Sequence, residues 1–151
     1  MQYGLLLLAI AAGFMLPIQG ALNARLGGLM EHPMQATLIS YIGGLIACLL
    51  VLFFVQRSVP EIRKLTEINW YLYCGGFLGA VFVSSMLYLM PKIGIANMLA
   101  AAIVGQLIMS TVLDHFGALG NPQIPVNSSR IIGIVLLLLG LYFIQRSRSV
   151  I

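Results

Sequence analysis

Long apolar stretches separated by short polar segments run the length of this 151-residue chain. A helix that crosses the hydrocarbon core of a bilayer needs roughly 20 mainly apolar residues, and five stretches fit that requirement. Each stretch is bounded by Gly, Pro, Asn or Arg residues, which end helices or anchor them at the headgroup boundary. The pattern therefore predicts an all-α membrane protein with a single transmembrane domain and five spans, at about 3–23, 34–55, 70–90, 95–113 and 128–146.

Three polar segments connect the later spans. Residues 56–68 hold three basic and two acidic residues with a proline, which is typical of a main polar loop. Residues 91–94 form a very short turn that predicts antiparallel third and fourth spans. Residues 114–127 are rich in Gly, Pro and Asn and predict a loop, and Asn127 or Ser128 is expected to cap the last helix.

Composition excludes most other protein classes. The chain is 60% hydrophobic and 8% charged, with a mean hydropathy of +1.01, whereas a soluble domain carries about a quarter charged residues. The eight basic residues are scattered, so they predict no nucleic-acid partner despite a pI of 9.4. Cys48 and Cys74 lack the spacing of a disulfide framework or zinc site. Nucleotide-binding and catalytic motifs are missing too, so neither an enzyme nor a cofactor is expected.

The distribution of basic residues gives the chain no preferred orientation. Lysines and arginines near span ends bias a membrane protein towards one topology. The first helix or the middle loop could still fix the orientation. Alternatively, the chain inserts both ways and pairs as an antiparallel dimer, which is the architecture of inverted-repeat transporters. Five spans place four basic residues on each side: Arg57, Arg63, Lys64 and Arg130 against Arg25, Lys92, Arg146 and Arg148.

Uncharged polar side chains lie inside the predicted spans, where they are expensive unless they face a bundle interior or a watery cavity. They occur as pairs at i and i+4, which places both members on one helix face. One interpretation is interhelical hydrogen bonds worth about 0.6 kcal/mol each. The other is the lining of a solute site, for which the candidates are Gln19, Asn23, Ser84, Tyr88, Gln106 and Ser110.

Charged side chains are missing from the predicted membrane midplane. All four acidic residues lie in loops or at a span end, which disfavours a cation/proton antiporter with a central carboxylate. Asp114 and His115, at the end of the fourth span, are the candidate proton relay, or else an interfacial polar pair that closes the helix. Gly133 and Gly140 share one face of the last span and are either a dimer interface or lipid-facing.

Three passages resemble the YdcZ-like family of bacterial inner-membrane proteins: PIQGALNARLG at 17–27, YLMPKIGIANMLAA at 88–101 and GQLIMSTVLDHFG at 105–117. This family is similar to half of a ten-helix transporter of the drug/metabolite transporter superfamily, and is one helix longer than the small multidrug resistance proteins. The resemblance implies a multi-pass inner-membrane protein that forms an antiparallel homodimer or pairs with a homologous chain. It also likens Gly133 and Gly140 to the dimerisation motif of the small multidrug resistance proteins. Their essential first-span Glu has no counterpart here, so their proton-coupled export of cations is not implied.

Together these observations predict a transporter that exports a small organic solute by alternating access at the interface of an antiparallel dimer. The expected partners are the lipid bilayer, a small-molecule substrate and a second copy of the chain or a paired homologous chain. A carboxamide-lined site without fixed charge suits a neutral, zwitterionic or lipid-like solute. The alternatives are a dual-topology channel for a small ion and a scaffold subunit that transports nothing.

Overall fold

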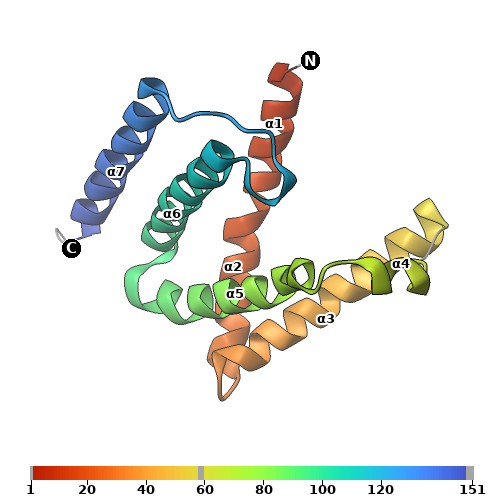
Figure 1. Cartoon of the computed structure of the whole chain (residues 1–151). Helices are drawn as coiled ribbons and strands as arrows, with labels where there is room; N and C mark the ends of the chain where they lie inside the picture. The colour runs from red at the N-terminus through yellow and green to blue at the C-terminus, as the bar shows by residue number, and fades with distance from the viewer. Residues whose placement is uncertain (1, 58–59, 149–151) are drawn as a thin grey trace. The chain divides into compact units, whose positions relative to one another are not determined.

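The computed structural model describes residues 2–57 and 60–148, and the regular structure in these ranges is helical (Figure 1). The chain divides into two compact units, Met1–Lys92 and Ile93–Ile151. The elements of the first unit are α1 (Gln2–Gly13), α2 (Met15–Leu29), α3 (Pro33–Val51), a π-helical turn η1 (Leu52–Gln56), α4 (Ile62–Glu67), a 3-10 turn η2 (Trp70–Tyr73) and α5 (Cys74–Ile93). The second unit contains α6 (Ile95–Phe116), a 3-10 turn η3 (Ala118–Gly120) and α7 (Ser128–Arg148).

Five helical segments of the described chain are long and apolar enough to cross a membrane, which confirms the expected number of spans. Each begins within a residue of its predicted start. The first, third and fourth continue several residues beyond their predicted ends. In the first and third spans the Gly and Pro residues there do not stop the helix, and the fourth continues through polar residues up to Gly117. The segments are Tyr3–Leu29, Pro33–Gln56, Trp70–Ile93, Ile95–Phe116 and Ser128–Arg146.

The first span is broken between α1 and α2 by a proline one turn downstream. Pro17 has no N–H to donate to the carbonyl of Gly13, and its ring crowds that carbonyl. The Phe14 N–H instead bonds to the carbonyls of Ile10 and Ala11, at 3.2 and 3.3 Å. The regular helix is therefore interrupted at Phe14, shortly before the polar residues of α2.

Helices α2 and α3 form a tight hairpin. The His32 Nδ1 accepts a hydrogen bond from the Met34 N–H at 3.2 Å, and Pro33 occupies the first turn of α3, where its missing N–H costs nothing. A Cβ on Gly27 would lie 3.8 Å from the Cβ of Ala36, which is fully buried. Small residues let the two backbones approach closely here, so Gly27 serves packing and does not end the helix.

Helix α5 packs on α2 through methionines. Met86, Leu87 and Met90 are buried, and the Met90 methyl group occupies the space that a Cβ on Gly20 would take. The unbranched thioether side chain adapts to the notch that the glycine leaves. This contact holds the middle of α2 against the C-terminal half of α5.

The expected loop at 56–68 contains a short helix, α4, that the sequence analysis did not predict. Its Arg63 and Glu67 side chains are 3.8 Å apart at i and i+4, but both are highly exposed and the pair stabilises little. The Tyr73 hydroxyl donates to the carbonyl of Leu65 at 2.6 Å and ties α4 to η2. The sequence predicted a loop here because the charged residues show helical spacing over a single turn only, which is too short to predict a helix.

The α6–α7 hairpin of the second unit turns at a glycine in a left-handed conformation. Gly117 has φ +59°, and a Cβ there would lie 3.2 Å from the Cβ of Gln123. The chain then returns to α7, whose start is capped by Asn127: its Oδ1 accepts from the Arg130 N–H at 2.9 Å. The cap is one of the two that the sequence predicted.

Replacing Gly20 with Leu should lower the free energy of unfolding by about 1–3 kcal/mol, because the new side chain displaces Met90 from a filled notch. The matched control is Gly28→Leu on the same helix, where a Cβ would meet nothing within 4 Å. Unfolding by a denaturing detergent, followed by circular dichroism, measures both variants. Equal stability of the two variants would contradict the packing described for α2 and α5.

Replacing Gly117 with Ala should destabilise the α6–α7 hairpin by about 1–2 kcal/mol, since a side chain at φ +59° is strained. Gly105→Ala on α6 is the control, because its Cβ has open space and the substitution improves helix propensity by about 1 kcal/mol. The same unfolding assay should therefore move in opposite directions for the two alanines. A gain of stability at both positions would show that the turn is not held as described.

Candidate functional site

Six polar side chains from three helices of the first unit lie close together, and we call them the polar cluster. They are connected by hydrogen bonds between helices and by shared hollows in the surface. The cluster lies where α2, α3 and α5 meet, between the Phe14 break and the α2–α3 turn. Its members are Gln19 and Asn23 of α2, Thr37, Ser40 and Tyr41 of α3, and Ser84 of α5.

The bond between α2 and α3 joins a buried carboxamide to a hydroxyl. Ser40 donates from its Oγ to the Asn23 Oδ1 at 2.5 Å, and Asn23 is only 8% exposed. An unpaired amide at this depth would cost free energy on the scale of a lost hydrogen bond or more. Asn23 and Ser40 therefore fix the register of α2 against α3.

The bond between α3 and α5 joins two hydroxyls. Thr37 is 3% exposed, and its Oγ1 lies 3.0 Å from the Oγ of Ser84. The Ser84 hydroxyl also lies 3.2 Å from the Met34 sulfur, on the first turn of α3. One turn further along α3, Tyr41 places its hydroxyl over Gly79, where a Cβ would be only 2.6 Å from the oxygen. The beginning of α3 is thus held on α5 by polar contacts.

Gln19 and Tyr41 are the exposed members of the cluster, and Gln19 borders two hollows. One, of about 370 Å³, opens between α2 and α3 and is lined by Gln19, Ser40, Tyr41, Gly44, Leu45 and Cys48. The other is a narrow space of about 40 Å³ between α2 and α5, lined on the α2 side by Leu16, Gln19, Gly20 and Asn23. The carboxamide of Gln19 therefore stands at the rim of the cluster, where a ligand could reach it.

The lining of both hollows is uncharged. Its polar groups are carboxamides, hydroxyls and a thiol, and the remainder is apolar. Carboxamides and hydroxyls both donate and accept hydrogen bonds, so they recognise hydroxyl, amide and carbonyl groups without requiring a counter-charge. Such a lining penalises an isolated ion, because nothing replaces its hydration. The arrangement suits binding and orientation of an uncharged or internally neutral solute.

Tyr88 lies one turn beyond Ser84 on α5 and is 56% exposed. The Lys92 Nζ is 3.5 Å from the centroid of its ring, which is a cation–π contact between successive turns. Tyr88 therefore lies on the same helix as Ser84 but outside the polar cluster, and its neighbour Lys92 is basic. The structure gives its ring a partner at the end of the span.

Gln106 and Ser110 belong to α6 in the second unit, and both are exposed. The Ser110 Oγ donates to the carbonyl of Leu107 at 3.0 Å, within its own helix. Nearer the start of α6, the Asn97 Nδ2 donates to the carbonyl of Ile93 at 2.9 Å. The Asn97 Oδ1 is buried without a partner among the described residues. Of the six predicted site residues, Gln19, Asn23 and Ser84 meet in the cluster.

Asp114 and His115 hold the loop after α6. Asp114 accepts from the Arg130 Nη1 at 3.0 Å, and both side chains are about one third exposed, at 32% and 31%. The His115 Nδ1 accepts from the Val126 N–H at 3.3 Å, and the His115 carbonyl accepts from the Gln123 Nε2 at 3.1 Å. The two residues connect α6 to the start of α7. Their role as a proton relay stays a prediction.

Gly133 and Gly140 lie on α7, seven residues apart. A Cβ added at either would meet nothing within 4 Å in the described part of the chain outside its own helix. The close contact that two such glycines permit is therefore not used within the described chain. Their role at a dimer interface stays a prediction.

The α3 members of the cluster were not among the predicted site residues. Thr37, Ser40 and Tyr41 stand at i, i+3 and i+4, which is the spacing of one helix face. That spacing, shortly after the Pro33 helix start, was a signal available in the sequence. Among the described residues, no group of three or more His, Cys, Asp or Glu is placed so that it could hold a metal ion.

The comparisons with known proteins agree with this architecture. Residues 4–143 match the family model described as "Putative inner membrane exporter, YdcZ". The chain is 27% identical over 137 residues to the inner membrane protein YdcZ of Escherichia coli strain K12, with 91% of each chain covered. No solved structure matches the chain. With its five apolar helices and this match over nearly the whole length, the chain is a multi-pass protein of the inner membrane and belongs to the YdcZ family of membrane transporters.

Proposed function

We propose that this protein exports a small, uncharged or zwitterionic organic solute by alternating access, and that the polar cluster binds the solute. The observation that carries the proposal is the Gln19 carboxamide at the rim of a hollow of about 370 Å³, directly beside the Asn23–Ser40 hydrogen bond. A binding site inside a membrane needs a few oriented polar groups in an otherwise apolar setting. The cluster supplies these groups and carries no fixed charge.

In this proposal the members of the cluster have different roles. Asn23 is hydrogen-bonded to Ser40, and Thr37 to Ser84. These residues therefore orient the site and hold α3 in register. Gln19 and Tyr41 border the open hollow and contact the solute. A transporter must also release its solute, and an exposed carboxamide on a kinked helix can exchange partners at low cost.

The proposal places the site in a dimer of two oppositely oriented copies, or of this chain with a paired homologous chain. The support is the equal number of basic residues that five spans place on each side, which removes the usual bias of orientation. Gly133 and Gly140 on α7 form the proposed dimer interface, since the space beside these two glycines is unoccupied in the described part of one chain. Two inverted copies would provide the pseudo-symmetry on which alternating access depends.

Residues outside the cluster complete the proposed path. Gln106 and Ser110 of α6 and Tyr88 of α5 are exposed polar groups, and the proposal assigns them to the lining of the path in the assembled transporter. Asp114 and His115 lie at the end of the fourth span, where a proton could enter, and the relay is tested by the dependence of transport on a proton gradient. The ion pair with Arg130 would have to open for Asp114 to take part.

Alanine at Gln19 or Ser84 should lower transport about fivefold, because each substitution removes a hydrogen bond worth about 1 kcal/mol at the site or in its support. Everted membrane vesicles are incubated with a defined mixture of uncharged and zwitterionic metabolites, and uptake is measured by mass spectrometry. Vesicles with the wild-type protein should accumulate at least one solute that empty vesicles do not.

Ser85→Ala is the matched control for Ser84→Ala, because the Ser85 hydroxyl is exposed and donates only to the Val81 carbonyl of its own helix, at 2.8 Å. Its uptake should stay within twofold of the wild type. Wild-type uptake in Gln19→Ala and Ser84→Ala would remove the site assignment. Very fast equilibration without accumulation would favour a channel, and an absence of any flux would favour a scaffold subunit.

A further inference from the structure

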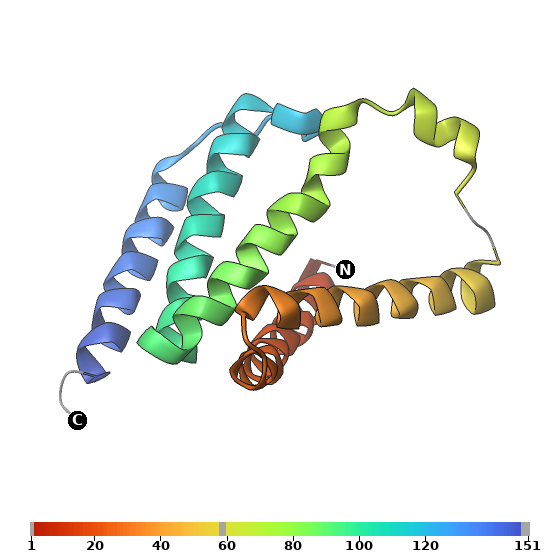
Figure 2. The same ribbon diagram turned by 90° about the horizontal axis from the view of Figure 1, so that it is seen from below.

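One face of α3 is uncovered from the polar cluster to the end of the span. The contacts that hold α3 on α5 involve its first turns, where Thr37 meets Ser84 and Tyr41 meets Gly79. Beyond them the residues of α3 are exposed as far as Val51. Figure 2 shows α3 diverging from α5 towards η1 within the first unit. The cluster thus lies at the end where α3 and α5 are in contact, before the two helices separate.

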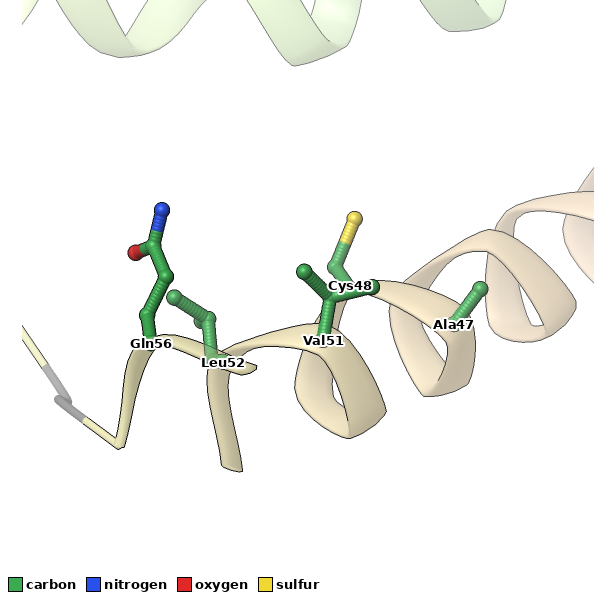
Figure 3. A pocket seen from close by; sticks show the side chains of 5 residues that line it. All are labelled: Ala47, Cys48, Val51, Leu52 and Gln56. Carbon is green, nitrogen blue, oxygen red and sulfur yellow. The ribbon is translucent and has the colours of Figure 1, made fainter. Parts of the chain in front are cut away.

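Two open hollows that share Cys48 follow this face. The hollow beside Gln19 ends at Cys48, and a second one of about 420 Å³ begins there, lined by Ala47, Cys48, Val51, Leu52 and Gln56. Figure 3 shows that the five side chains of this second hollow point to the same side of the helix. We call the combined surface the α3 groove, and it consists of Ser40, Gly44, Ala47, Cys48, Val51, Leu52 and Gln56.

The α3 groove has polar ends and an apolar middle. Ser40, with Gln19 and Tyr41 beside it, forms one end, and the Gln56 carboxamide forms the other. Sixteen residues of helix separate these ends, which is ~24 Å along the axis. Between them the small side chains of Gly44, Ala47 and Cys48 leave the space that larger residues would fill. The residues that line the two hollows are all uncharged.

We propose that the α3 groove binds the apolar part of an amphiphilic solute whose uncharged polar head is held by Gln19, Ser40 and Tyr41. This inference rests on the proposed function and names its substrate class. The head receives hydrogen bonds at the cluster, and an apolar chain extends past Gly44 to Cys48, ~12 Å along the helix. Burial of the chain in a site without charges provides the affinity, whereas the hydroxyl and carboxamide groups provide the orientation.

The proposal selects one occupant over two others. A bilayer lipid with a charged headgroup would find no counter-charge at the cluster, because the lining of the groove is uncharged. A second copy of this chain could cover α3 instead, since small residues also suit helix contacts. Three polar groups gather at the cluster end of the groove, however, and Gln56 stands alone at the other end, which matches one head and one tail better than a helix that is apolar along its length.

The test uses octyl glucoside with a photoreactive diazirine in its alkyl chain, added to the full-length protein in phosphatidylcholine vesicles. After illumination, labelled peptides are quantified by mass spectrometry. We expect labelling of residues 40–56 to exceed that of the other spans at least fivefold. Excess octyl glucoside should remove this labelling, and glucose, which is the head alone, should not. The same chain with a trimethylammonium head should label these residues at least fivefold less.

Two adjacent glycines provide matched variants. Gly44 lines the groove and Gly43 does not, yet a Cβ at either position would meet nothing within 4 Å. Both leucine variants should therefore fold. Gly44→Leu should fill the groove and lower the competed labelling at least fivefold, whereas Gly43→Leu should stay within twofold of the wild type. Equal labelling in the two variants would overturn the proposal.

The alternative occupants give distinct outcomes. Labelling spread evenly over all five spans, or equal labelling by the cationic probe, means that the groove holds only bulk lipid and overturns the proposal. Cys48 reports on a second copy in a Cys74→Ala protein: an oxidative Cys48–Cys48 crosslink in most molecules before any probe is added would overturn it too. Loss of transport in Gln19→Ala together with even labelling would leave the proposed function intact and reject this inference alone.

Discussion

The absence of water from the bilayer core is the constraint on which this structure depends. Polar groups at that depth need partners inside the protein, and the spans supply many of these partners through their helical backbone and through two kinds of side-chain hydrogen bond. Ser85, Ser110 and Thr111 donate to carbonyls of their own helices. Asn23 and Thr37 bond instead to side chains of other helices. The second kind connects α2, α3 and α5, and it marks where the first unit concentrates polarity without charge.

Sequence length and hydropathy were enough to predict the five spans, since the thickness of the bilayer fixes how many apolar residues a helix needs. Local chemistry also predicted Asn127 as a cap. Helix α4 was not predicted because its charged residues cover little more than one helical turn, and such a short pattern cannot be distinguished from a loop. The break at Phe14 follows from Pro17, which has no N–H to donate to the carbonyl one turn upstream.

The site could be predicted only in part. An i and i+4 pair places Gln19 and Asn23 on one face of a helix, but it does not say which helix that face meets. The partner is α3, whose Thr37, Ser40 and Tyr41 share one helix face by their spacing, but this spacing does not say that the face meets α2. Gln106 and Ser110 are on a helix of the second unit, so their part in the path depends on the assembled transporter. Side-chain pairing between helices is a tertiary property, and hydropathy carries no information about it.

The central claim is that the chain forms a transporter by pairing with an oppositely oriented copy. Glu31 and Thr66 are exposed residues in segments that five spans place on opposite sides of the membrane. In a protein with Cys48 and Cys74 replaced by alanine, Glu31→Cys and Thr66→Cys are each labelled from outside intact cells with an impermeant maleimide. We expect each cysteine to react in about half of the molecules. Complete labelling of one and none of the other would contradict the claim, because all copies would then share one orientation.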